Sequence, residues 1–66
     1  MKLYIQEKEA VVGMTVETSR GEKAILIDWR APGELLAGKS GRVYCKPEGS
    51  DSISEWYPAV IKGCFK

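Results

Sequence analysis

A short basic and aromatic stretch carries the clearest chemical signal in this chain. Arg42, Tyr44 and Lys46 alternate with Val43 and Cys45, so an extended chain places the first three on one face and the last two on the other. An aromatic ring between two cations can stack on a base or pack against a partner, while the cations meet phosphates or carboxylates. We therefore predict a binding face made of Lys39, Arg42, Tyr44, Lys46, Trp56 and Tyr57.

A plainer interpretation of the same residues stays open. The aromatic side chains can fill a small core, and the cations can simply keep one strand hydrated. Trp56 and Tyr57 are adjacent, so on a strand they point to opposite faces and one of them has to leave the core. With ten basic and nine acidic residues and a net charge of +1, only the stretch from 35 to 47, which lacks acidic side chains, can attract a polyanion. Any such binding is expected to be weak and sensitive to salt.

The residue types for catalysis or metal binding are sparse. The chain has no histidine and only two cysteines, Cys45 and Cys64. The usual general base is therefore missing, and two thiols cannot complete a four-ligand zinc site. We expect a non-catalytic protein without cofactor or metal. Whether the two thiols are free stays open, although a reducing compartment favours free thiols.

A phosphate-loop pattern, G-x-x-x-x-G-K-[ST], is matched by residues 33–40. In a nucleotide site the backbone N–H groups of such a loop surround phosphates, and the loop opens a helix. Here Ser40 is followed by Gly41 and the strand-like stretch 42–45. We therefore expect a flexible glycine loop and no binding of ATP or GTP.

The elements that position these residues are predicted to be strands. Val16 alternates with polar neighbours, a polar turn follows at 19–22, and the stretch 24–29 is rich in β-branched and aromatic residues. Together these features predict a hairpin over 14–30 with Gly21 in its turn. Further strands are expected at 3–5, 42–46, 53–57 and 62–65. Between them we expect a charged turn at 7–9 and a single 3₁₀ turn at 59–61. The long connection at 31–41 is expected to contain one packed turn formed by Leu35 and Leu36. The spacing of these strands favours a closed barrel over an open sheet.

The expected fold is thus all-β, with five or six short antiparallel strands in one domain over residues 1–66. Its core should hold the odd positions of the second hairpin strand, because Asp28 and Arg30 then face water. The expected core residues are Val16, Ile25, Ile27, Trp29, Val43 and Ile53.

The chain resembles a small SH3-like barrel of the KOW or Tudor kind in three features. These are the spacing of Val16 and Gly21, the Ile-x-Asp-Trp strand and the closing aromatic-Pro pair. The chain also resembles, over residues 13–61, the plasmid-encoded type II dihydrofolate reductases, which are tetrameric SH3-like barrels. Gly13-Met14 and the 16–21 spacing match the opening strand and turn of that family, Ile27 and Trp29 its second strand, and Tyr57-Pro58 the end of its active-site strand.

The second resemblance implies a site on a symmetry axis, but the sequence departs from it there. Glu55 and Trp56 replace the glutamine and isoleucine of the active-site strand, and Thr18 stands where the family has a pore lysine. A tetramer would lose cations and gain carboxylates, which opposes the binding of two anionic ligands.

Three functions follow from these observations. The first is a stand-alone binding module that contacts a protein or nucleic acid through the aromatic and basic face. The alternatives are a reductase-like oligomeric enzyme and an adaptor of phage or mobile-element origin with an unknown target. The apolar character of the N-terminus ends within five residues, so we expect no signal peptide, no membrane association and a cytoplasmic protein. Self-association stays open.

Overall fold

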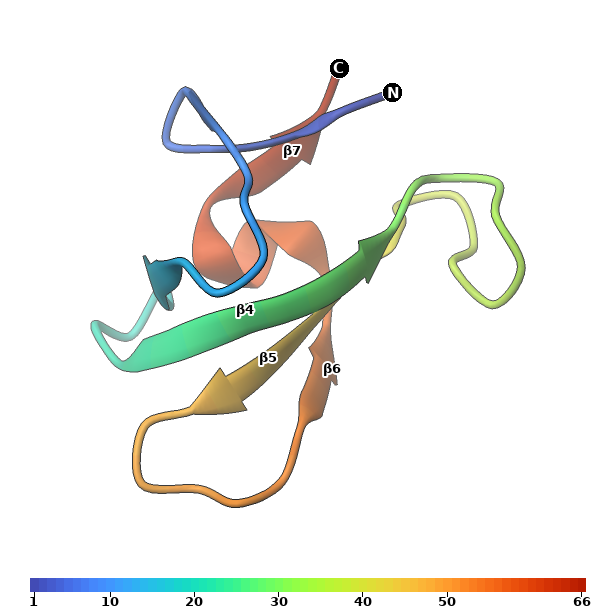
Figure 1. The fold of residues 1–66 in the computed structure, drawn as a ribbon. Coiled ribbons are helices and arrows are strands. Elements are labelled where there is room, and N and C mark those ends of the chain that lie inside the picture. The colour runs from blue at the N-terminus through green and yellow to red at the C-terminus, as the bar shows by residue number, and fades with distance from the viewer.

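A computed structural model describes the whole chain, residues 1–66, as seven short strands and one 3₁₀ turn (Figure 1). In chain order the elements are β1 (Leu3–Ile5), β2 (Lys8–Glu9), β3 (Thr15–Glu17), β4 (Lys23–Arg30), β5 (Arg42–Pro47), β6 (Ser54–Trp56), η1 (Pro58–Ile61) and β7 (Gly63–Phe65). The all-β prediction is confirmed, with seven strands in place of the expected five or six, and the 3₁₀ turn and the last strand lie where the sequence predicts them.

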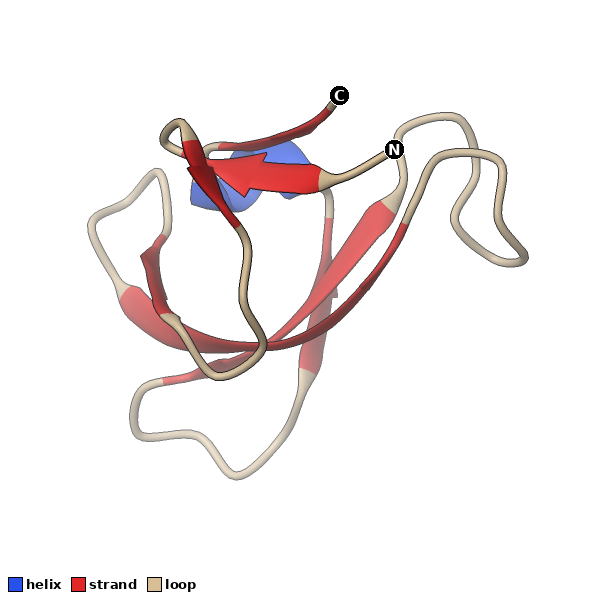
Figure 2. Ribbon diagram, turned by 45° about the horizontal axis from the view of Figure 1, so that its top comes forward, coloured by secondary structure: helices blue, strands red, loops and turns tan.

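The strands form two antiparallel sheets, with the orders β2-β1-β7 and β3-β4-β5-β6. Figure 2 shows the smaller sheet and η1 packed over the larger one. The expected closed barrel is therefore not formed as a continuous ladder of strands. Between β6 and β7 the backbone donors are used inside η1, where Val60 N–H bonds to the Tyr57 carbonyl and Lys62 N–H to that of Ala59.

The β3–β4 hairpin, at one edge of the larger sheet, is held by a side chain in its turn. Thr18 is buried, and its Oγ1 accepts hydrogen bonds from the N–H groups of Arg20 and Glu22. Gly21 has a φ of +84°, a value that most residues avoid. The predicted turn and its glycine are confirmed.

The inward residues of β4 change phase at a bulge. Ala24 and Leu26 point inward and are 2% and 0% exposed. The register then shifts between Leu26 and Asp28, so Ile27 is an extra residue, and Trp29 packs on the core beyond it. Choosing the odd positions throughout was therefore wrong for Ile25, which is exposed, and for Ile27, which lies at the bulge and is not part of the core cluster, because a bulge moves the alternation by one residue. Asp28 faces water as predicted.

The core lies between the two sheets and is small. Val16 and Val43 belong to it as predicted, whereas Ile53 precedes β6 and is 57% exposed, so its assignment to the core was wrong. Its buried apolar members are Leu3, Ile5, Ala10, Val16, Ala24, Leu26, Val43, Cys45 and Ile61.

Two connections differ from their predictions. Residues 8 and 9 of the charged segment pair with β1 as the short strand β2, so the turn itself is at Gln6 and Glu7, both with positive φ. Leu35 and Leu36 do not form a packed turn, because both side chains point into solvent. None of the helical segments has the length and apolar character needed to cross a membrane.

Candidate binding site

The predicted alternation of β5 is confirmed. Val43 and Cys45 are fully buried, and Arg42, Tyr44 and Lys46 lie on the opposite side of the strand. The split between the adjacent aromatics is confirmed as well, since Trp56 packs on the core and Tyr57 is 56% exposed. Trp56 is therefore part of the core packing and not of the outer face.

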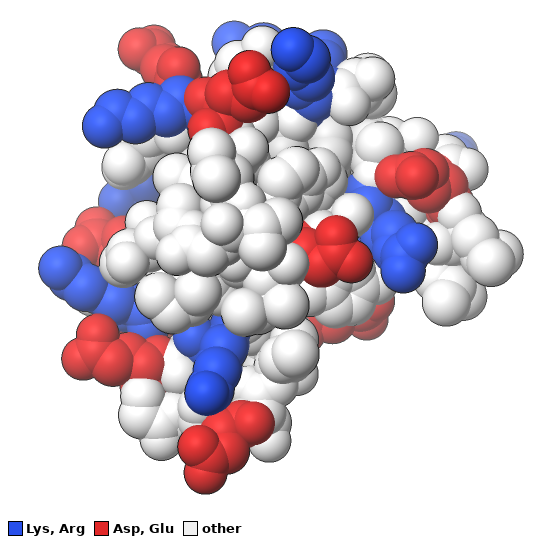
Figure 3. Space-filling view, in the orientation of Figure 1, with Lys and Arg blue, Asp and Glu red and all other residues white.

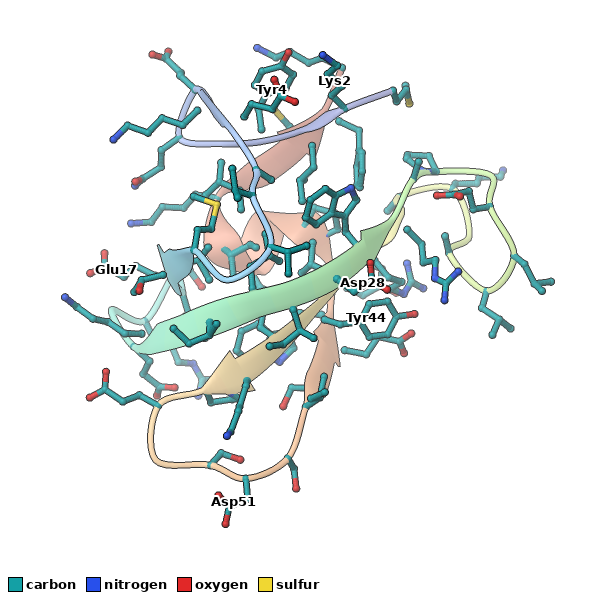
Figure 4. All side chains as sticks on the ribbon, in the orientation of Figure 1. Lys2, Tyr4, Glu17, Asp28, Tyr44 and Asp51 are labelled. Carbon is teal, nitrogen blue, oxygen red and sulfur yellow. The ribbon has the colours of Figure 1, made fainter.

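We use the term outer face for the solvent side of β4, β5 and the end of β6. Its residues are Asp28, Arg30, Arg42, Tyr44, Glu55 and Tyr57. Figure 4 shows Asp28 and Tyr44 on this side of the sheet, and Figure 3 shows basic and acidic groups next to each other there.

Arg42 is a fixed side chain at the end of this face. Its guanidinium carbon lies 4.3 Å from the centroid of the Tyr57 ring, within the distance of a cation–π interaction. Its Nη1 also donates hydrogen bonds to the carbonyl oxygens of Ala37, at 2.9 Å, and Gly41, at 2.7 Å. Arg42 thus joins the loop 33–41 to Tyr57, a role that the spacing of charges in the sequence does not indicate.

Tyr44 does not lie unpaired between two cations as predicted. It stands opposite Asp28 in β4 and Glu55 in β6, and its hydroxyl donates to Glu55 Oε2 at 2.9 Å. This hydrogen bond raises the pKa of Tyr44 above its ordinary value, while the nearby Arg30 acts in the opposite direction. Only strand pairing brings these carboxylates to Tyr44. The absence of acidic residues from 35 to 47 in the sequence therefore does not mean that Tyr44 lacks acidic neighbours in the fold.

The two predicted lysines lie apart from the Arg42–Tyr57 pair. Lys39 is exposed on the loop 33–41. Lys46 is opposite Ile25 and lines a separate hollow of about 400 Å³ with Lys23 and the turn at 48–51. Of the six residues predicted for the binding face, the structure therefore brings together Arg42, Tyr44 and Tyr57.

An apolar groove that the sequence analysis missed begins at Tyr57. It has a volume of about 650 Å³ and contains no Asp, Glu, Lys or Arg side chain. Its lining residues are Met1, Pro32, Ser40, Tyr57, Pro58, Ala59, Val60, Gly63, Cys64 and Phe65. The run from 57 to 61, with its proline and small apolar residues, is the only sequence signal for it.

The glycine loop contains two internal backbone hydrogen bonds and leads into a strand. Gly33 N–H donates to the Gly38 carbonyl at 2.9 Å, and Ala37 N–H to that of Glu34 at 3.0 Å. The loop is followed by β5 and not by a helix, as the sequence context indicates. The helix N-terminus on which a phosphate loop depends is not formed at Ser40.

The two cysteines are both free. Cys45 is buried in the core, and burial raises the pKa of its thiol to about 11, so this thiol is protonated and unreactive at neutral pH. Cys64 is exposed in the groove. No group of three or more His, Cys, Asp or Glu side chains lies close enough to hold a metal ion.

Comparison with known proteins adds no relative to this description. No protein family, curated protein or solved structure matches the chain. The function is therefore argued from the site itself.

Proposed function

We propose that this chain is a non-catalytic binding module that contacts a protein partner through Arg42, Tyr44 and Tyr57. The observation that supports it best is the guanidinium of Arg42 held over the ring of Tyr57, which is itself 56% exposed. Two hydrogen bonds to the loop fix the arginine before any partner arrives. A preformed arginine–tyrosine pair is typical of the residues that dominate binding energy at interfaces.

The charges of the outer face favour a protein over a nucleic acid. Asp28 and Glu55 flank Tyr44, so a phosphate backbone laid along the face would meet two carboxylates. A protein segment can match mixed charges, with its own carboxylate at the guanidinium and an apolar side chain on the Tyr57 ring. We therefore propose a partner segment in which an acidic residue lies close to an apolar one.

The proposed scaffold is a small SH3-like barrel, and the proposed location is the cytoplasm. The short antiparallel strands and a 3₁₀ turn directly before the last strand support the first proposal. Two free thiols support the second, since a reducing compartment keeps thiols unpaired.

The reductase-like alternative has less support from the side chains. Thr18, which occupies the place of the pore lysine, uses its hydroxyl inside the hairpin turn. Glu55 lies on the outer face, while Trp56 of the same strand packs on the core.

Peptide selection followed by variant analysis tests the proposal. Peptides selected from a random display library on the immobilised protein should be enriched in an acidic residue near an apolar one. Tyr57→Ala should weaken binding of a selected peptide at least about tenfold. The matched control is Tyr4→Ala, because Tyr4 carries a comparable cation, Lys66, at 5.8 Å but belongs to the smaller sheet.

Peptide titration followed by amide chemical shifts provides the independent readout. Shifts confined to residues around Arg42, Tyr44 and Tyr57 are expected, with a folded spectrum for both variants. Shifts on the smaller sheet, or tighter binding of oligo-dT than of any selected peptide, would contradict the proposal.

A further inference from the structure

The loop 33–41 presents two leucines to solvent at its tip. Leu35 and Leu36 are 84% and 80% exposed, and Leu36 has a φ of +67°, a conformation that is rare for a bulky residue. The loop is anchored next to its tip, since Ala37, which follows Leu36, is fully buried and its carbonyl accepts a hydrogen bond from Arg42. Figure 1 shows the loop, between β4 and β5, extending away from the body of the protein. The tip is thus an apolar projection beside an anchored residue.

The apolar groove begins at the base of the same loop. Pro32 and Ser40, which flank the loop, are among its lining residues. Its volume of about 650 Å³ lies within the range of roughly 300–1,000 Å³ found for pockets that enclose a ligand. Uncharged leucine side chains suit it, because no charged side chain would have to give up its hydration.

The exposed surface of the chain lies slightly above the average for its size. A compact monomer of 7.3 kDa exposes about 4,200 Å², whereas this chain exposes 4510 Å². The projecting loop and the open groove provide surface that a partner can cover.

We propose that the Leu35–Leu36 tip of one copy enters the groove of a second copy, and that the exchange is reciprocal about a two-fold axis near the loop bases. Because tip and groove adjoin on each copy, one rotation brings both tips over both grooves and closes the assembly at two subunits. Tyr57 lines the groove and also belongs to the binding face proposed above, so a seated tip and a bound partner segment would compete for its ring; the two proposals are therefore tested by separate readouts.

The size of the contact agrees with a dimer of modest affinity. Each copy contributes the ten lining residues of its groove and the seven loop residues 33–39, seventeen in all, which is fewer than the 20–30 residues, about 800 Å², that one side of a stable interface uses. A single tip in a single groove would bury far less, so the reciprocal arrangement is the one that the surface supports.

The oligomeric state and one matched pair of variants test the proposal. Native mass spectrometry and light scattering over a concentration series should show a monomer–dimer equilibrium for the unaltered chain. Leu36→Asn suits the positive φ, so the fold should be retained while the dimer dissociation constant rises at least about tenfold. The control Val12→Asn changes another exposed apolar residue, 62% exposed and outside both loop and groove, and should leave the dimer unchanged.

Cross-linking locates the contact. Leu36→Cys places a thiol at the tip, Cys64 lies in the groove, and the buried Cys45 stays out of reach. With a short bismaleimide, a mixture of ¹⁴N- and ¹⁵N-labelled Leu36→Cys protein should give linked tryptic peptides 31–39 and 63–66 that carry one label each. Adding Cys64→Ser should abolish this link.

Four results would overturn the proposal. They are a monomer at every concentration, an unchanged dimer in Leu36→Asn, assemblies that grow beyond two subunits, and a 36–64 link only between peptides with the same label. The last result would show that the tip folds onto its own groove. None of these measurements involves peptide binding at the outer face, so failure here leaves the proposed function unaffected.

Discussion

Thr18 shows how one hydroxyl can hold a hairpin turn. Its Oγ1 accepts two backbone N–H groups while the residue is only 6% exposed. Thr18→Val keeps the shape but removes the acceptor, so the free energy of unfolding should fall by about 1–2 kcal/mol. Urea unfolding measures this loss.

Thr18→Ser is the control for that prediction, since it retains the acceptor and removes only a methyl group. Its loss should be the smaller of the two. If the serine variant proves less stable than the valine variant, the methyl packing and not the hydrogen bonding stabilises the turn.

Cys45 predicts a dependence of stability on alkaline pH. Burial raises the pKa of its thiol from 9.0 to about 11 in the folded state. The unfolded chain therefore loses this proton first, so the stabilisation is complete below about pH 9 and is lost as the pH rises towards 11. The slope is at most about 1.4 kcal/mol per pH unit.

Urea unfolding from pH 7.5 to 10.5 under reducing conditions checks this dependence. Cys45→Ala should be less stable at pH 7.5, because it leaves a cavity, but its stability should fall less steeply with pH. Parallel curves for the two proteins would mean that other groups, such as Tyr44, account for the whole dependence.

At the scale of elements, the loop 33–41 depends on one glycine in particular. Gly41 has a φ of +75°, and a Cβ added there would lie 2.7 Å from both the Arg30 carbonyl oxygen and Phe65 Cε2. Gly41→Ala therefore combines backbone strain of about 1–2 kcal/mol with a clash, and should cost more than about 2 kcal/mol in the free energy of unfolding. Thermal and urea unfolding both report it.

Gly33→Ala is the matched comparison within the same loop. Its φ is +87°, but nothing lies within 4 Å of an added Cβ. It should lose only the strain contribution, about 1–2 kcal/mol. Equal losses at both positions would show that the surroundings of Gly41 adjust to the methyl group.

Most of the strands could be predicted from the sequence, except the two-residue strand β2, and their relative register could not. Alternation in residues 42–46 identifies β5 and its two faces, because a half-buried strand needs that period. The same rule fails in β4, where the bulge at Ile27 changes the inward phase. It also cannot show that Glu55 and Asp28 stand beside Tyr44, since pairing depends on partners far along the chain.

The candidate site was only partly predictable for the same reason. Arg42, Tyr44 and Tyr57 were identified by residue type. The hydrogen bonds that fix Arg42 come from backbone carbonyls at 37 and 41, and every residue type has such a carbonyl. The apolar groove joins residues 1, 32, 40, 57–60 and 63–65, and only the tertiary fold brings these segments together.

At the scale of the whole molecule, the margin of stability is small. A domain of this size gains roughly 3–5 kcal/mol from its core, and nine residues form the buried apolar cluster here. A substitution that costs 2 kcal/mol therefore removes a large share of the total. Binding and cross-linking experiments on variants need a folded fraction measured under the same conditions.

The two tryptophans give the protein a built-in optical probe. Trp29 and Trp56 both pack on the core, while the exposed aromatic of the outer face is a tyrosine. Indole emission thus follows the integrity of the interior, and the proposed contact surfaces contain no indole group that a ligand could quench directly. A spectral shift on adding a partner would accordingly signal rearrangement between the sheets, whereas an unchanged spectrum alongside measured binding would identify docking onto a rigid body.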